Sequence, residues 1–217
     1  MLDFDALRTR MVDGQLRTND VTNFELLAAL LDVPREVFVP AQMKALAYLD
    51  EDIRIATGRY LMEPIPFGKL AQAAQVGPQD VVLDIGCGTG YSSAVFSRLA
   101  SLVIGVEEDE ALAAQATANL EKLGYSNVAI RKGALIEGSS QDAPFDVIFF
   151  NGSVEFIPET ILNQLKDDGR LVAVEGHGNS AVAKLYRRDG NDVSPRFLFN
   201  SSIKPLPGFA KAQEFVL

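Results

Sequence analysis

Residues 80–90 read DVVLDIGCGTG and give the clearest structural signal in the chain. Its first half is a continuous apolar run with β-branched side chains, which predicts a strand buried on both faces of a parallel sheet. Its second half places Gly86, Gly88 and Gly90 at every other position. Because glycine has no Cβ and tolerates positive φ, such a turn lets a ligand approach the backbone closely. The stretch therefore predicts a strand, a ligand-binding turn and the start of a helix.

Downstream of this stretch, apolar strand patterns alternate with helical ones. The strand patterns fall at 102–107, 127–132, 145–151 and 169–175. The helical patterns fall at 91–100, 109–123 and 158–166. The alternation predicts right-handed crossovers and a doubly wound, Rossmann-like α/β fold with helices on both faces of the sheet. Two further strand-like runs predict an antiparallel C-terminal edge, at 184–188 and 197–203.

Upstream, the chain begins with an N-terminal helical extension. Apolar residues recur at three and four positions over 4–16 and 23–31, which is the helical period. Thr22 or Asn23 suits the N-cap of the second helix. Two helices are therefore predicted before the first proline of the chain.

Residues 33–66 are interrupted by prolines and glycines and are predicted to be rich in loop, with a helix near 40–47. The predicted organisation is one structural unit in two parts. A helical and loop segment, residues 1–66, packs on a ligand-binding domain, residues 67–217.

The 217 residues carry a net charge of −9, spread along the chain. A nucleic-acid partner needs clustered Lys and Arg and is not expected. The single cysteine, Cys87, permits no intramolecular disulfide and no cysteine-based zinc site, and no metal is predicted. No signal peptide and no run of roughly 18 apolar residues is found. A cytoplasmic protein without a membrane segment is expected, and its oligomeric state is left open.

An acidic residue ends each of two predicted strands beside the glycine turn. Asp84 precedes the glycines, and Glu107 ends the next strand, where a ribose hydroxyl pair would be held. The dinucleotide pattern G-x-G-x-x-G would need glycine at position 91, which is Tyr91. The G-x-G-x-G spacing after an acid instead resembles motif I of the methyltransferases that use S-adenosyl-L-methionine (SAM). A structural glycine turn and an NAD-linked oxidoreductase are the alternatives.

Further stretches extend this resemblance over nearly the whole chain. They are MVDGQLR at 11–17, VPREVFVP at 33–40, AYLD at 47–50, APFDVIFFN at 143–151, IP at 157–158, QL at 164–165, GRLVAVEG at 169–176 and IKPLPG at 203–208. In this order they resemble the protein-L-isoaspartate O-methyltransferases, which methylate the abnormal isoaspartyl carboxylate of damaged proteins. The resemblance implies a three-layer α/β/α methyltransferase fold, SAM as methyl donor, a protein or peptide substrate, and a substrate loop before motif I.

That loop reads GRYLMEP over 58–64. In the family the equivalent loop carries a threonine and a serine whose hydroxyls are implicated in binding the isoaspartyl carboxylate. Here Tyr60 and Met62 replace them. Arg59, which can bind a carboxylate through a bidentate contact, and the phenol of Tyr60 are expected to substitute for them in part. The catalytic positions predicted from the resemblance are therefore Arg59, Tyr60 and Met62. Three outcomes stay open: isoaspartyl activity in which the carboxylate is bound by different side chains, methylation of another acceptor such as a small carboxylate, or SAM binding without catalysis.

The cofactor site is predicted from the glycine turn and from the loops that follow the neighbouring strands. Its predicted residues are Asp84, Gly86, Cys87, Gly88, Thr89, Gly90, Glu107, Gly133, Ala134 and Asn151. In the family an acid near the adenine stands where this chain has Ala134. Cys87 lacks an activating neighbour in sequence and is assigned no catalytic role. His177 is predicted to be a solvated loop residue. Ser153 is predicted either to lie in a plain turn or to face the substrate.

Overall fold

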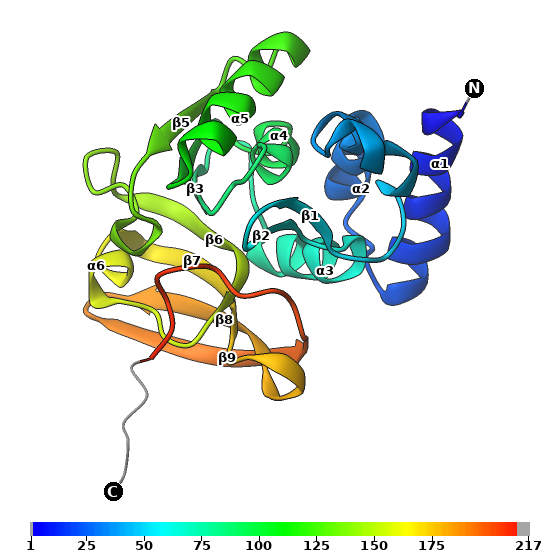
Figure 1. Ribbon diagram of the computed structural model, residues 1–217. Coiled ribbons are helices and arrows are strands. Elements are labelled where there is room, and N and C mark those ends of the chain that lie inside the picture. Colours follow the sequence, from blue (N-terminus) through cyan, green and yellow to red (C-terminus); the bar gives the residue numbers. More distant parts are fainter. Residues whose placement is uncertain (1, 212–217) are drawn as a thin grey trace, which may run out of the picture.

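The computed structural model describes residues 2–211 and contains a seven-stranded sheet with the order β5-β4-β3-β6-β7-β8-β9 (Figure 1). Strands β3 to β7 run parallel to one another, whereas β8 is antiparallel to β7 and β9 is antiparallel to β8. The bounds of the strands are β3 Val81–Ile85, β4 Leu102–Glu107, β5 Val128–Lys132, β6 Phe145–Val154, β7 Leu165–Glu175, β8 Val182–Asp189 and β9 Asp192–Asn200. The predicted doubly wound α/β fold with an antiparallel edge is confirmed.

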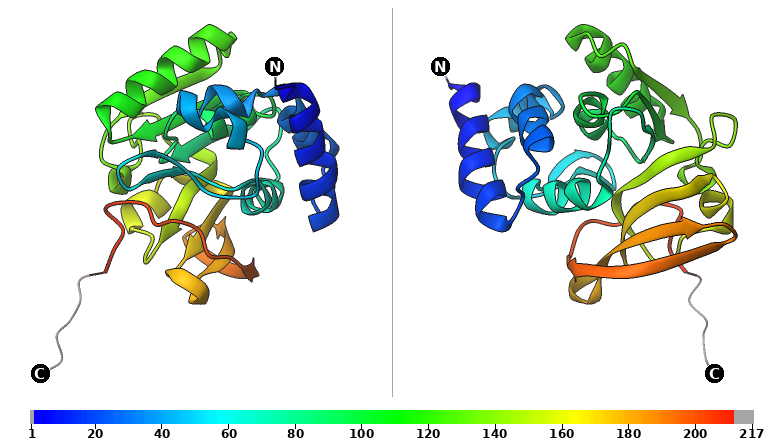
Figure 2. Two further views of the ribbon diagram at one scale, coloured as in Figure 1. Left: turned by 45° about the vertical axis from the view of Figure 1, so that its right-hand side comes forward. Right: turned by 180° about the vertical axis from the view of Figure 1, so that it is seen from behind.

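The two faces of the sheet are buried against different elements. Successive side chains of a strand point to opposite faces, so Val82 and Phe149 lie in one core cluster while Leu83 and Phe150 lie in the other. The helices α1 and α2 lie together with α3 on one side of the sheet (Figure 2). The bounds of the helices are α1 Phe4–Met11, α2 Phe24–Asp32, α3 Pro64–Ala74, α4 Tyr91–Ser97, α5 Glu110–Leu123 and α6 Glu159–Leu162.

The second face carries less helix. It is covered by the short helix α6, by the 3-10 turn η5 at Leu135–Glu137 and by the segment 203–209. This segment crosses the end of β6, where the N–H of Ser153 donates to the carbonyl of Lys204 and the N–H of Leu206 donates to the carbonyl of Ser153. It is drawn in red in Figure 1. Residues 203–208, part of the quoted family resemblance, therefore lie at the carboxyl ends of the strands.

The N-terminal part contains more regular structure than the sequence predicts. Helix α1 continues through a π-helical turn, Val12–Leu16, and a 3-10 turn, Arg17–Asn19. Asn23 caps α2 by accepting from the N–H of Leu26. Two short strands, β1 Ile53–Ala56 and β2 Arg59–Leu61, form a separate two-stranded sheet, called here the β1–β2 hairpin.

The structure differs from the prediction in three segments. The segment 33–66 is not simply loop, because it holds the β1–β2 hairpin and the start of α3, and a proline at the first helical position favours that start. The helix near 40–47 is a 3-10 helix, Ala41–Leu46, and a further 3-10 turn covers Arg35–Val37. The helix predicted over 158–166 ends at Leu162 because β7 begins at Leu165.

Three further bounds differ: β7 begins at Leu165 where 169 was predicted, α4 ends at Ser97 where 100 was predicted, and β9 lies at Asp192–Asn200 where 197–203 was predicted. The helix predicted over 109–123 agrees closely: Asp109 is the N-cap of α5, and Gly124 adopts positive φ at its end. Within residues 2–211, none of the helices has the length and apolar character required to cross a membrane.

Candidate active site

The glycine turn follows β3 at the carboxyl edge of the sheet. Gly86, Gly88 and Gly90 have φ values of +73°, +57° and +97°, which L side chains rarely adopt. The N–H groups of Gly86 and Cys87 donate to the carbonyl of Val106 on the neighbouring strand. The turn is therefore fixed between β3 and β4, and α4 begins directly after Gly90.

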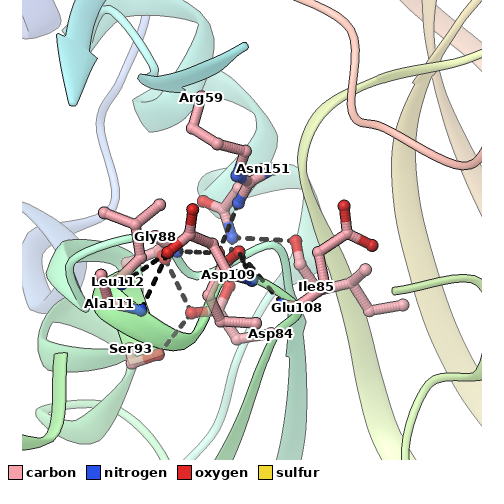
Figure 3. Close-up of polar contacts among 12 residues, drawn as sticks. Arg59, Asp84, Ile85, Gly88, Ser93, Glu108, Asp109, Ala111, Leu112 and Asn151 are labelled. Atoms are coloured by element: carbon pink, nitrogen blue, oxygen red, sulfur yellow. Dashed lines mark hydrogen bonds and ion pairs between the residues drawn. The ribbon is translucent and has the colours of Figure 1, made fainter. Parts of the chain in front are cut away.

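Asp84 is fully buried beneath this turn. Its Oδ2 accepts from the hydroxyls of Ser92 and Ser93, at 2.7 and 2.5 Å, and its Oδ1 accepts from the side-chain amide of Asn151. Burial raises the pKa of Asp84 to about 6, although the three hydrogen bonds act in the opposite direction. The structure thus brings together two of the predicted cofactor residues, Asp84 and Asn151 (Figure 3).

Glu107, at the end of β4, is also fully buried. Its Oε1 accepts from the N–H groups of Glu108 and Asp109, both at 3.1 Å. Its Oε2 accepts from the N–H of Gly88 at 2.8 Å and from the guanidinium of Arg59 at 2.5 Å. Both oxygens of the predicted ribose-binding acid are therefore already engaged.

Arg59 reaches Glu107 from the first position of β2, and it is only 5% exposed. Figure 3 shows its side chain pointing from the β1–β2 hairpin toward the glycine turn. Its Nε is buried without a hydrogen-bond partner in the part of the chain that the structure describes. Arg59 is therefore a buried member of the candidate site and is bound to an acid.

Side chains of the chain itself occupy the space in front of the glycines. A Cβ added to Gly86 would lie 2.7 Å from Leu206, and one added to Gly88 would lie 2.6 Å from Ile55. A cavity of about 10 Å³ lies beside Gly58, Arg59 and Leu206, which is room for about one water molecule. The acids and the turn suit a nucleoside, and in this arrangement Leu206 and Ile55 stand in front of the glycines that would face it.

The remaining predicted cofactor residues lie around the turn and beside Glu107. The hydroxyl of Thr89 donates to the carbonyl of Phe38 and so ties the turn to the N-terminal part. Burial raises the pKa of the Cys87 thiol well above its ordinary value, which agrees with its predicted lack of a catalytic role. The N–H of Gly133 donates to the carbonyl of Glu107, and Ala134 next to it is exposed.

The substrate-loop positions divide between two environments. Tyr60 is half-buried and its ring lies 5.7 Å from the Nζ of Lys204. Met62 is 5% exposed, and its carbonyl accepts from the guanidinium of Arg35. The sequence predicted no role for Arg35, which is 1% exposed and anchors the substrate loop through this hydrogen bond.

Comparison with known proteins identifies the architecture. The protein-L-isoaspartate(D-aspartate) O-methyltransferase family matches residues 8–199. The chain belongs to this family. The protein-L-isoaspartate O-methyltransferase of Koribacter versatilis (strain Ellin345) is 35% identical over 201 residues, 93% of this chain and 90% of that protein. The one from Roseiflexus castenholzii is 35% identical over 207 residues, 95% of this chain and 94% of that protein.

Solved structures agree with this assignment. A protein-L-isoaspartate O-methyltransferase structure superposes with a TM-score of 0.80 at 26% identity, covering 93% of this chain and 66% of the other. A Plasmodium falciparum structure, described as a protein-L-isoaspartate O-methyltransferase in complex with S-adenosyl-L-homocysteine, superposes with a TM-score of 0.77 at 18% identity. It covers 95% of this chain and 99% of the other, and at this identity it supports the fold alone.

Within this protein-L-isoaspartate O-methyltransferase fold, Met62 is part of the hydrophobic core. Met62→Ser is expected to lower the free energy of unfolding by about 2–4 kcal/mol, because it leaves a cavity and buries a hydroxyl. Urea denaturation would measure the loss. Tyr60→Thr, at the half-buried position two residues earlier, is the matched change and is expected to cost less. Equal stability of Met62→Ser and the unmodified chain would contradict the buried position of Met62.

Three acidic side chains, Asp50, Asp52 and Glu63, lie close together beside the substrate loop and are called here the acidic mouth. Such a cluster is unexpected in an enzyme family that methylates carboxylates. Burial is the main cause that raises the pKa of Glu63, to about 7, and the nearby carboxylates of Asp52 and Asp50 raise it further. Burial also raises the pKa of Asp52. Lys204 opposes both shifts through its charge. Near pH 7, Glu63 therefore holds a proton about half of the time.

This shift predicts a pH-dependent stability. The pKa of Glu63 is higher in the folded chain than its ordinary value of 4.5, so the folded state holds the extra proton and stability falls as pH rises from about 4.5 to 7. Glu63→Gln is expected to be more stable than the unmodified chain at pH 8, by about 1 kcal/mol after allowance for solvent screening. The two should be equally stable at pH 4. Urea denaturation at both pH values measures this, and a gain that is independent of pH would contradict it.

Proposed function

We propose that this chain is a SAM-dependent protein carboxyl O-methyltransferase whose acceptor is the isoaspartyl carboxylate of damaged protein. Membership of the family supports the reaction type, and the buried acids around the glycine turn support the cofactor class. When bound, SAM supplies an already activated methyl group. Because a carboxylate acceptor is ionised near pH 7, the chain needs to position it and needs no strong base.

One observation supports the proposal above the others. Asp84 and Glu107 lie at the carboxyl ends of adjacent parallel strands, on either side of a turn whose glycines have positive φ. Ligands of open α/β sheets bind outside the carboxyl ends of the strands, and the acid at the second strand suits a ribose. A turn of purely structural use would not require two fully buried carboxylates beside it.

A second candidate is the same methyl transfer to an acceptor that carries no carboxylate. The acidic mouth favours it, because Asp50, Asp52 and Glu63 would repel a negatively charged acceptor. The loop positions Tyr60 and Met62 also present more apolar surface than small hydroxyl residues would. This candidate differs from the first in the acceptor alone.

The test is transfer of a labelled methyl group from SAM to a peptide that contains an isoaspartyl residue, with the matching aspartyl peptide as control. A base-labile label on the isoaspartyl peptide alone is the expected result. A base-stable label on an acceptor in a cell extract, with no label on either peptide, would favour the second candidate. No transfer to any acceptor in a cell extract, at saturating SAM, would contradict both.

We also propose a cytoplasmic location, which is supported by a single cysteine, Cys87, that is buried and reduced. A protein or peptide is the proposed partner. The location can be tested by detecting the chain with an antibody in fractionated cells.

A further inference from the structure

We infer that Arg59 competes with the cofactor for Glu107, and that the β1–β2 hairpin is a lid which must move before SAM can bind. The inference rests on the proposed function, because it concerns the cofactor of that reaction. It adds a control step, which is argued from the side chains of Arg59, Glu107 and Ile55. Four observations carry it.

The first observation is that Glu107 has no free acceptor position for a ribose. Three of its four donors are backbone N–H groups, that of Gly88 in the glycine turn and those of Glu108 and Asp109 directly after β4. The fourth donor is the side chain of Arg59. A ribose hydroxyl pair that binds Glu107 must displace one of the four. Arg59 is the donor that can leave without unfolding the turn.

The second observation is that Arg59 is incompletely satisfied where it lies. Its Nε is buried without a partner in the described chain. An unsatisfied buried donor costs free energy, so the closed arrangement is held by the contact with Glu107 and weakened by the orphaned Nε. A side chain in this state can be displaced by a ligand that offers Glu107 better partners.

The third observation is that one movement removes both obstacles near Gly88. Ile55, whose Cδ1 lies 2.6 Å from where a Cβ of Gly88 would be, belongs to β1, and Arg59 belongs to β2. The two strands form one hairpin, so its displacement clears the space in front of Gly88 and frees Glu107 together.

The fourth observation is that the hairpin is fixed at its base and not at its tip. It is a two-stranded sheet separate from the main sheet, with a register irregularity between Arg54 and Ala56. Ile53 and Leu61, at its base, are buried in the hydrophobic core. Gly58, in its turn, is exposed, has a φ of +68°, and has open space around it. The tip of the hairpin, which carries Ile55 and Arg59, is therefore the part of the lid that moves, and Gly58 permits a change of backbone conformation there.

The consequence is that the closed arrangement lowers the affinity for the cofactor. A protein whose binding-competent state is only a fraction of the population binds more weakly by that fraction. Removal of either obstacle should therefore strengthen binding. Because Arg59 and Ile55 obstruct the site by different means, charge and volume, their replacement tests the lid in two independent ways.

The experiment is calorimetric titration of S-adenosyl-L-homocysteine into four proteins: the unmodified chain, Arg59→Gln, Ile55→Ala and the control Arg54→Gln. Arg54 lies on the same hairpin but is exposed and bonds only within it. At least tenfold tighter binding is expected for Arg59→Gln and Ile55→Ala, with Arg54→Gln within twofold of the unmodified chain. Thermal melting without ligand checks that each protein is folded, and Ile55→Ala keeps the ion pair should Arg59→Gln be unstable.

The outcomes separate this inference from the proposed function. Equal or weaker binding by both Arg59→Gln and Ile55→Ala would overturn the lid, even if the unmodified chain methylates an isoaspartyl peptide. Tighter binding by both would support the lid, even if no isoaspartyl peptide is methylated. Absence of binding in all four proteins would overturn the lid and count against the cofactor as well.

Discussion

Glu107→Ala is expected to lower the free energy of unfolding by about 3–5 kcal/mol, which is the usual cost of removing one partner of a buried ion pair. The change leaves the guanidinium of Arg59 buried without its acid. It also removes the acceptor of three backbone N–H groups, those of Gly88, Glu108 and Asp109. Urea denaturation, with the slope checked for two-state behaviour, measures the loss.

A double-mutant cycle isolates the pair. Arg59→Ala combined with Glu107→Ala is expected to be more stable than the sum of the single losses predicts, because neither charge is then left unpaired. The control is Glu110→Ala, at an exposed carboxylate that pairs with Lys132 at the surface, and its urea midpoint should not change measurably. Equal midpoints for Glu107→Ala and Glu110→Ala would show that the buried pair is absent in solution.

Arg35→Ala is expected to have a comparable effect, about 3–5 kcal/mol, for a different reason. Arg35 lies 1% exposed, donating from Nε to the carbonyl of Ala47 at 2.7 Å and from its terminal nitrogen to the carbonyl of Met62 at 2.6 Å. Its guanidinium lies 4.8 Å from the ring centroid of Tyr91. Truncation leaves two carbonyls unsatisfied and opens a cavity. Burial lowers the pKa of Arg35.

Arg35→Met separates these two causes. Methionine refills most of the volume and removes a buried charge that has no carboxylate within hydrogen-bonding distance in residues 2–211, so this variant should lose less than half as much stability as Arg35→Ala. Arg54→Ala, at an exposed arginine, is the control. Hydrogen exchange at the N–H of Glu63, next to Met62, should quicken in both Arg35 variants, because the carbonyl that anchors the loop is released. Unchanged exchange would mean that Arg35 does not hold the loop.

The fold could be predicted from the sequence where local patterns and packing agree. Continuous apolar runs such as 102–107 form the buried parallel strands, and Gly124 ends its helix as predicted. The prediction failed at α3, whose prolines were taken as breaks although a proline at the first helical turn favours a helix. It failed also at the β1–β2 hairpin, because β2 is three residues long and too short to show an alternating pattern.

The candidate site could be predicted in part. The glycine spacing and the two acids identify the turn, Asp84 and Glu107, because they are close in sequence to the strands that hold them. The ion pair of Arg59 with Glu107 joins residues far apart in the chain and depends on the missed hairpin. The role of Arg35 likewise depends on a distant carbonyl, that of Met62, and nothing in the local sequence points to it.

The most direct measurement is a crystal structure of the chain with S-adenosyl-L-homocysteine bound. The account predicts that the ribose hydroxyls lie on Glu107, that the guanidinium of Arg59 has left this carboxylate, and that Ile55 has moved away from Gly88 with the rest of the hairpin. The ligand bound over the glycine turn while Arg59 still contacts Glu107 at 2.5 Å would contradict it.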